Sequence, residues 1–244
     1  MKELTLLEIL EQAFERSRDL DAPLAARLQS FADAVRLTSP EFADAADRLV
    51  QRLQESGSGA SAPKVGEPMP AFMLPDDEGH LVTLEGALER GPVALSFHRG
   101  HWCPYCRINT NALAQAQCEV EPLGAQIIAI TPDIQHFSRV LKAQAALRPF
   151  PILTDIDNAY SMSLNLTIFV GLEMSKLMKG AGVELPRYQG NDAWMLPIPA
   201  TFIVGQDGVI KARFIDPDYR RRMAIEDIVQ ALSQAKAEPA ANVS

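Results

Sequence analysis

The first 55 residues repeat apolar side chains every three or four positions, the spacing of one face of an α-helix. Helix-start signals precede three such stretches: a capping box over Thr5–Glu8, then Pro23, then Ser39–Pro40. The apolar positions are Leu6, Leu7, Leu10 and Phe14; Leu24, Leu28, Phe31 and Val35; and Phe42, Ala46, Leu49 and Leu53. We therefore predict a helical extension of three short amphipathic helices over residues 1–55. Such helices bury little core alone, so we expect their apolar faces to pack on the rest of the chain or on another subunit.

The pattern changes after residues 56–63, a stretch without charged or large side chains that we interpret as a flexible linker. Beyond it, short apolar runs that predict strands alternate with helical periodicities. Strands are expected over 92–97, 126–131, 201–204 and 209–214, the last two as a hairpin, and helices over 106–121, 134–147 and 225–235. This order predicts an α/β domain over 64–236, a mixed sheet flanked by helices, followed by a tail over 237–244. Residues 166–197 fit no period, and we interpret them as an insertion of short helix and loop, an arrangement typical of a lid or binding loop.

Composition limits the function classes. The 244 residues carry a net charge of −8 with 47% hydrophobic residues. That balance is typical of a folded soluble protein and argues against a nucleic-acid or anionic-membrane partner. The acidic first 20 residues and the absence of a long apolar run favour a cytoplasmic location without a signal peptide. Three cysteines in a reducing compartment predict core thiols, metal ligands or redox chemistry rather than structural disulfides.

The candidate chemistry lies in the segment Trp102–Cys106, a Cys-x-x-Cys motif formed by Cys103 and Cys106. The motif follows an apolar strand and opens a helix, where free amide groups and the positive end of the helix dipole stabilise a thiolate. Trp102 beside the dithiol would shield it from water. Four flanking side chains could add positive charge or exchange protons: His98, Arg99, His101 and Arg107.

Zinc is disfavoured as an explanation of the cysteines, because no second ligand pair occurs at the usual spacing. Cys118 lies 12 positions beyond Cys106, about 18 Å along one helix. We expect Cys118 to be a small buried hydrophobe. The sequence thus indicates neither a metal nor an organic cofactor.

The region from Val65 to Lys236 resembles the peroxiredoxin family, also called the alkyl hydroperoxide reductase and thiol-specific antioxidant family, and the dithiol resembles the thioredoxin motif. The resemblance rests on the Trp-Cys-x-x-Cys segment and on the segments GEPMPAFML with DEG and VTL (66–84), ILTD (152–155) and PATFIV with DG (199–208). It implies a thioredoxin fold with the N-terminal helices as an extension, and an antioxidant peroxidase as the activity.

Three family positions differ in this chain: Arg99, Cys103 and Pro199. The family pattern Pro-x-x-x-Thr-x-x-Cys falls on Arg99, Cys103 and Cys106, so that Cys106 takes the place of the cysteine that attacks the peroxide. Cys103 replaces the threonine that hydrogen-bonds the peroxide. The arginine that often precedes the Ala-Thr-Phe strand is here Pro199. By comparison with thioredoxin, Pro199 matches a proline expected to be cis, which with Thr201 and Trp102 would form a substrate-binding edge.

Two activities compete for the dithiol. In the first, Cys106 reduces a hydroperoxide with the help of Arg99, and Cys103 resolves the sulfenic acid to a disulfide that thioredoxin or a small thiol reduces. In the second, Cys103 attacks a disulfide of another protein and Cys106 resolves the mixed disulfide. The resemblance favours the peroxidase, with the protein-disulfide reductase as the alternative and a redox-sensing or scaffold protein as a third. We also expect a homodimer held partly by the extension.

Overall fold

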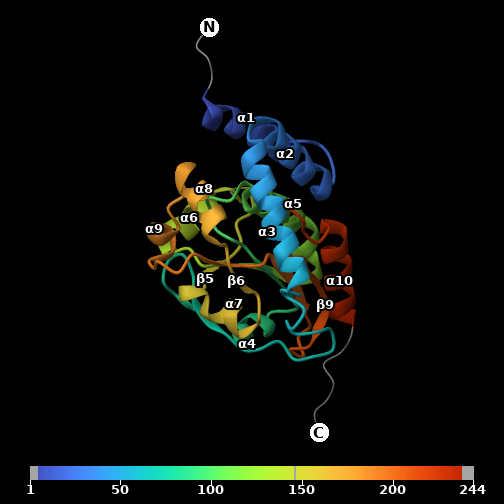
Figure 1. The fold of residues 1–244 in the computed structure, drawn as a ribbon. Coiled ribbons are helices and arrows are strands. Elements are labelled where there is room, and N and C mark those ends of the chain that lie inside the picture. The colour runs from blue at the N-terminus through green and yellow to red at the C-terminus, as the bar shows by residue number, and fades with distance from the viewer. Residues whose placement is uncertain (1–4, 146, 238–244) are drawn as a thin grey trace.

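A five-stranded mixed sheet forms the centre of the molecule (Figure 1). The computed structural model describes residues 5–145 and 147–237. The sheet order is β5-β4-β3-β8-β9, with β3, β4 and β5 parallel and β8 and β9 antiparallel to their neighbours. The strands are β3 (Val93–Phe97), β4 (Gln126–Thr131), β5 (Ile152–Thr154), β8 (Ala200–Val204) and β9 (Ile210–Ile215). The prediction of an α/β domain with a thioredoxin-type mixed sheet is confirmed.

Helices cover both faces of this sheet because its strands bury side chains on both sides. Alternate residues along β3 divide between two cores: Ala94 faces α5, α6 and α10, whereas Leu95 faces the opposite layer. The first layer contains α5 (Pro104–Val120), α6 (Gln135–Ala143) and α10 (Ile225–Ala237). The second contains the hairpin of β1 (Met73–Pro75) and β2 (Leu81–Thr83) with α4 (Leu84–Leu88) and α7 (Ala159–Ser163). Two 3₁₀ turns, Glu121–Leu123 and Ile156–Asn158, complete the connections.

The insertion predicted over 166–197 contains short helices, as expected, and also a pair of short strands. It contains β6 (Thr167–Phe169), α8 (Leu172–Gly180), α9 (Leu185–Gln189) and β7 (Met195–Pro197). β6 and β7 pair antiparallel to each other. Strands of three residues are too short to show a period in the sequence, which explains why they were not predicted.

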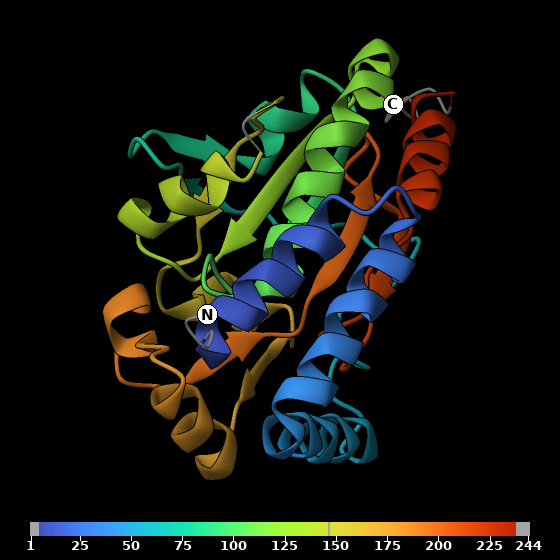
Figure 2. The ribbon, with the colours of Figure 1, turned by 90° about the horizontal axis from the view of Figure 1, so that it is seen from above.

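The N-terminal extension folds as three helices, as predicted: α1 (Leu6–Arg18), α2 (Leu24–Thr38) and α3 (Pro40–Glu55). The capping box at Thr5 and Glu8 is formed, and Pro40 occupies the first turn of α3. Phe14 and Phe31 share one core with Tyr105 of α5 and Met174 of α8. Figure 2 shows α1 and α2 lying along α5. The apolar faces of the extension were expected to pack on the rest of the chain or on another subunit. In this structure they pack on the rest of the chain.

Polar contacts also hold the extension in place. Arg27 of α2 is buried and donates hydrogen bonds to Asn111 and Gln115 of α5, at 2.7 and 3.0 Å. Arg107 of α5 pairs with Glu11 of α1 at 3.0 Å. None of the helices in the described part of the chain is long and apolar enough to span a membrane.

The segment interpreted as a flexible linker is held by hydrogen-bonded turns. The amide of Ser58 donates to the carbonyl of Leu53 at 2.9 Å, and Ala62 is buried. The guanidinium of Arg213 in β9 donates to the carbonyls of Ala62 and Pro63, at 2.7 and 2.6 Å. The backbone between the extension and the sheet is therefore fixed on β9 rather than loose.

Candidate active site

Both cysteines of the motif lie at the N-terminus of α5, directly after the carboxyl end of β3. Cys103 is the N-cap residue, Pro104 starts the helix, and Cys106 lies in the first turn. This is the arrangement that the sequence predicted, because proline in the first turn loses no intrahelical hydrogen bond. Both cysteines are buried and both are free thiols in this structure.

The loop between β3 and α5 depends on Gly100. Its φ of 139° is one that side chains rarely adopt. A Cβ at this position would lie 2.5 Å from Nε1 of Trp102 and 2.8 Å from Oδ1 of Asp133. Only glycine therefore lets the loop turn between these two side chains into the dithiol helix.

The sulfur of Cys106 accepts hydrogen bonds from two nitrogen donors. The backbone amide of Arg99 lies 3.3 Å from Sγ, and Nη2 of Arg222 lies 3.4 Å from it. Burial by itself raises the pKa of the Cys106 thiol, but hydrogen bonds from Cys103 and His98 and the positive charge of Arg222 outweigh it. The pKa of Cys106 is therefore well below its usual range, which favours the thiolate on Cys106 rather than on Cys103.

The Cys103 thiol has the opposite character. Burial raises its pKa, and so does the hydrogen bond that it donates to Cys106, although Arg99 and Arg222 act in the other direction. Cys103 thus acts as a neutral donor to the neighbouring thiolate. The motif register placed Cys103 at the position of the family's threonine, and in this structure its partner is the sulfur of Cys106.

A cluster of buried polar side chains surrounds His98 near the dithiol. His98 is fully buried, and its Nε2 lies 2.9 Å from Oγ of Ser96 and 3.4 Å from Nδ2 of Asn109. Its Nδ1 lies 3.4 Å from Oγ1 of Thr110. His98 thus lies inside the protein, and it contributes to the lowered pKa of Cys106.

Arg222 is the functional side chain that the sequence reasoning missed. It lies in the loop between β9 and α10, 116 positions from Cys106. Pro199 had been taken as the loss of the family's activating arginine, and the structure supplies a guanidinium to the same sulfur from this other loop. The available signal was the run Arg220–Arg222 after Tyr219, but three adjacent arginines are usually a solvated surface.

The side chain of Arg99 lies on the cavity wall with Cys103 and packs on two aromatic rings. Its guanidinium carbon lies 4.0 Å from the ring centre of Tyr219 and 5.1 Å from that of Trp102, a cation–π arrangement with both rings. It is the backbone amide of Arg99 that contacts Cys106. Trp102 thus lies next to the dithiol as expected, packed on Arg99.

The predicted substrate-binding edge at Pro199 and Thr201 is only partly present. The described residues contain no cis peptide bond, so the expectation of a cis bond at Pro199 is wrong. The amide of Ile198 donates to the carbonyl of Leu166 at 2.7 Å, which keeps the chain extended from β7 into β8. Thr201 is buried opposite Ser96 in the central sheet. Its place is therefore inside the sheet.

Two further side chains near the motif differ in their surroundings. Cys118 is exposed, which corrects the expectation of a buried thiol. It shares its face of α5 with exposed Gln115, while Gln117 and Val120 face the core. His101 is held by the buried carboxylate of Asp133, which accepts from its backbone amide at 2.6 Å and lies 3.0 Å from Nδ1.

A largely apolar cavity of about 370 Å³ lies between the extension and the dithiol. Cys103 forms part of its wall, but Cys106 does not. The other lining residues come from α1, α2, α3, α5, α8, α9 and the neighbouring loops, and include Phe14, Phe31, Arg99 and Trp102. Within the described residues, no three His, Cys, Asp or Glu side chains gather as a metal site.

Comparison with known proteins agrees with this geometry. The profile of the AhpC/TSA family matches residues 65–213, more than half of the chain. The chain belongs to the AhpC/TSA family. Within this family match lie the dithiol, Arg99 and His98, whereas the extension and Arg222 fall outside it. The additional wall of the cavity and the guanidinium on Cys106 are thus contributed by regions beyond the family match.

Individual relatives agree with the family assignment. The chain is 24% identical over 188 residues to the 1-Cys peroxiredoxin PER1 of Hordeum vulgare, covering 72% of this chain and 78% of that protein. Two solved structures, the peroxidoxin BcpB of Mycobacterium tuberculosis and a mutant of peroxiredoxin 6 of Arenicola marina, share the fold. Each is 18% identical at a TM-score of 0.54 and covers 70% of this chain, with 97% and 72% of the respective structures covered. Family and fold support a thiol-dependent peroxidase activity.

Proposed function

We propose that this protein is a thiol peroxidase in which Cys106 attacks a hydroperoxide and Cys103 resolves the product. The observation that carries the proposal is the sulfur of Cys106, which accepts from the Arg99 amide and the Arg222 guanidinium and has a lowered pKa. These groups stabilise a thiolate, and the thiolate is the nucleophilic form of cysteine.

The proposed reaction oxidises the two thiols by two electrons. The Cys106 thiolate attacks one peroxide oxygen, so that an S–O bond forms and the O–O bond breaks, and the released alkoxide or hydroxide takes up a proton. Cys106 is then a sulfenic acid. The sulfur of Cys103 attacks it, the disulfide forms, and water leaves with the proton of Cys103. A thioredoxin or a small thiol supplies the two electrons that restore the dithiol.

The cavity favours an organic hydroperoxide over hydrogen peroxide. Its volume of about 370 Å³ is several times that of two water-sized oxygen atoms, at roughly 30 Å³ each. Phe14, Phe31 and Tyr219 on its wall stabilise only an apolar substituent. A hydroperoxide that packs this substituent against them would lie with its peroxide group at Cys103, beside Cys106.

A protein-disulfide reductase is the second candidate, because Cys103 and not Cys106 lies on the cavity wall. In that reaction Cys103 would have to be the attacking thiolate. The raised pKa of Cys103 opposes this role, since little thiolate forms on it at neutral pH. We therefore place the peroxidase first.

The cytoplasmic location and the homodimer remain part of the proposal. Composition and charge favour the location. The extension packs on its own chain, so a dimer would have to use other surfaces or the side chains that α1 leaves exposed, such as Leu6 and Leu7.

The proposed function is tested by two assays on the same sample. We expect steady-state consumption of cumene hydroperoxide with thioredoxin or a small thiol as reductant, and little reduction of insulin disulfides by the reduced protein. Rapid insulin reduction without peroxide turnover would contradict the peroxidase and support the disulfide reductase. Cys118→Ser is the matched control, because Cys118 lies exposed on α5 outside the site.

A further inference from the structure

The loop between β9 and α10 carries the activating guanidinium. Arg222 lies at its end, and Nη1 of Arg222 donates to the carbonyls of Tyr219 and Arg221. Nη2 of the same side chain lies 3.4 Å from the sulfur of Cys106. The backbone of residues 219–221 thus orients the guanidinium, so a shift of this loop moves the charge relative to the sulfur.

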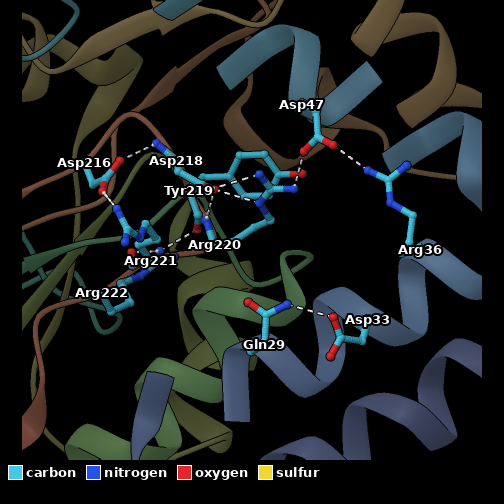
Figure 3. A network of polar contacts seen from close by, with 10 residues as sticks. All are labelled: Gln29, Asp33, Arg36, Asp47, Asp216, Asp218, Tyr219, Arg220, Arg221 and Arg222. Atoms are coloured by element: carbon cyan, nitrogen blue, oxygen red, sulfur yellow. Dashed lines mark hydrogen bonds and ion pairs between the residues drawn. The ribbon is translucent and has the colours of Figure 1, made fainter. Parts of the chain in front are cut away.

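This loop is bound on its outer side to the N-terminal extension. Figure 3 shows Asp47 of α3 between two arginines, Arg36 of α2 and Arg220 of the loop. Oδ1 of Asp47 accepts from Nη1 of Arg220 at 2.6 Å, and Oδ2 accepts from Nη2 of Arg36. Asp218 within the loop accepts from Nε and Nη2 of Arg220, at 2.8 and 3.0 Å. Asp47 is therefore a carboxylate that connects the extension to the loop.

We propose that Asp47 is a positioning residue: through Arg220 it holds the loop that places Arg222 on Cys106. The inference rests on the proposed role of Cys106 as the attacking thiolate. Asp47 does not touch the reacting atoms, since it acts through the loop. Its bridge also places part of the control of the thiolate in the extension, outside the region that matches the family.

The contact between Asp47 and Arg220 should affect the position of Arg222 and the stability of the fold to different degrees, for two reasons. The Asp47 side chain is 49% exposed, and ion pairs at such sites contribute little to folding. The attraction between the guanidinium and the thiolate, in contrast, acts in a buried site, where it falls quickly as the distance grows. Loss of the bridge should therefore change the chemistry of Cys106 more than the stability of the protein.

The chain offers a matched control for Asp47. Asp44, one turn earlier on α3, also accepts from Arg36 and is 58% exposed. No contact in the described residues joins Asp44 to the loop. Asp47→Ala and Asp44→Ala therefore both leave Arg36 with one carboxylate partner, and only the first releases Arg220 from α3.

The test measures the titration of Cys106 alone, in a Cys103→Ser, Cys118→Ser background, by the ultraviolet absorbance of the thiolate. Cys106 is faced by His98, Arg222, the Arg99 amide and residue 103, and Asp133 acts on it at longer range. We expect Asp47→Ala to raise the pKa of Cys106. At a pH near that pKa, the single-turnover peroxide rate should fall about threefold, which is less than the effect of removing the whole charge contact. Asp44→Ala should leave both values unchanged, Asp47→Glu should restore them, and melting temperatures should stay close together.

The result that overturns the proposal is an equal profile for Asp47→Ala and Asp44→Ala while Arg222→Ala still raises the pKa of Cys106. That outcome would leave the proposed peroxidase standing and remove only the positioning role. An unchanged profile in Arg222→Ala as well would show that Arg222 does not set the pKa of Cys106, and the positioning role would fall with it.

Discussion

At the scale of single residues, the two cysteines differ because their neighbours differ. Cys106 accepts from an amide and a guanidinium, whereas Cys103 only donates to Cys106. In many dithiol helices the N-terminal cysteine is the thiolate, because it lies nearest the free amides of the first turn. Here the surrounding groups favour the thiolate on the second cysteine. This is the arrangement that the peroxidase requires.

Substitution of Arg222 tests this residue-scale account. Arg222→Ala removes a positive charge that contacts Cys106, and we expect the pKa of Cys106 to rise. A group whose folded-state pKa is lowered stabilises the fold above its unfolded pKa and loses that contribution as pH falls through the folded pKa. The wild type should therefore lose both peroxidase rate and stability as the pH falls through this lowered value, and Arg222→Ala should lose rate already at a higher pH.

Arg99→Ala serves as the comparison for Arg222→Ala. Its guanidinium packs on Tyr219 and Trp102, and its amide, which the substitution keeps, contacts the sulfur. We expect a smaller shift in the titration of Cys106 than Arg222→Ala produces, measured by alkylation rate against pH. A larger shift with Arg99→Ala would assign the activating charge to Arg99, as the sequence alone suggested.

At the scale of elements, the N-terminal extension forms part of the cavity wall and also packs in the core shared with α5. α1 and α2 contribute Phe14 and Phe31 to the cavity beside Cys103, and these helices lie outside the family match. The same aromatic side chains belong to the core shared with α5. Substrate selection and the stability of the extension therefore depend on overlapping residues.

A cavity-filling substitution in α2 tests the predicted preference for organic hydroperoxides. Val35 lines the cavity, and Val35→Phe adds a ring to it. We expect kcat/KM for cumene hydroperoxide to fall severalfold, while kcat/KM for hydrogen peroxide stays close to the wild-type value, because steric exclusion affects only the larger substrate. Leu37→Phe is the control, since Leu37 lies on the same helix and is 83% exposed. An equal loss with both substrates would show that the cavity does not select them.

The elements near the dithiol were predictable because their signals are local. The apolar run over 126–131 coincides with β4, and the position of Cys103 at the start of α5 follows from Pro104. Arg222 was not predictable, because its contact with Cys106 depends on the path of the loop after β9. Exposed Cys118 shows the same limit: the face of a long helix that packs on the sheet depends on tertiary contacts.

At the scale of the whole molecule, the extension and the sheet domain form one packed body. Buried Arg27 and the shared core with Tyr105 and Met174 join them, and hydrogen-bonded turns connect them. The sequence predicted a flexible linker between the extension and the α/β domain. The observed packing instead indicates that either part alone would expose apolar surface.

Cleavage of the chain within residues 56–62 tests this whole-molecule account. We expect the two fragments to stay together in gel filtration and the nicked protein to keep its peroxidase activity, because the buried contacts hold without the connecting backbone. Light scattering of the intact protein, measured in the same experiment, shows whether it is the predicted homodimer or a monomer. Fragments that separate with an active, soluble sheet domain would contradict the account of one packed body.

The central claim is that Cys106 is the residue that hydroperoxide oxidises first. Its most direct test is a single exposure of Cys103→Ser and Cys106→Ser to cumene hydroperoxide in the presence of dimedone, followed by mass spectrometry. We expect a sulfenic acid adduct on Cys106 in the Cys103→Ser protein and no adduct on Cys103 in the Cys106→Ser protein. An adduct on Cys103 in the second protein, with none on Cys106 in the first, would contradict the assignment and make Cys103 the attacking thiol.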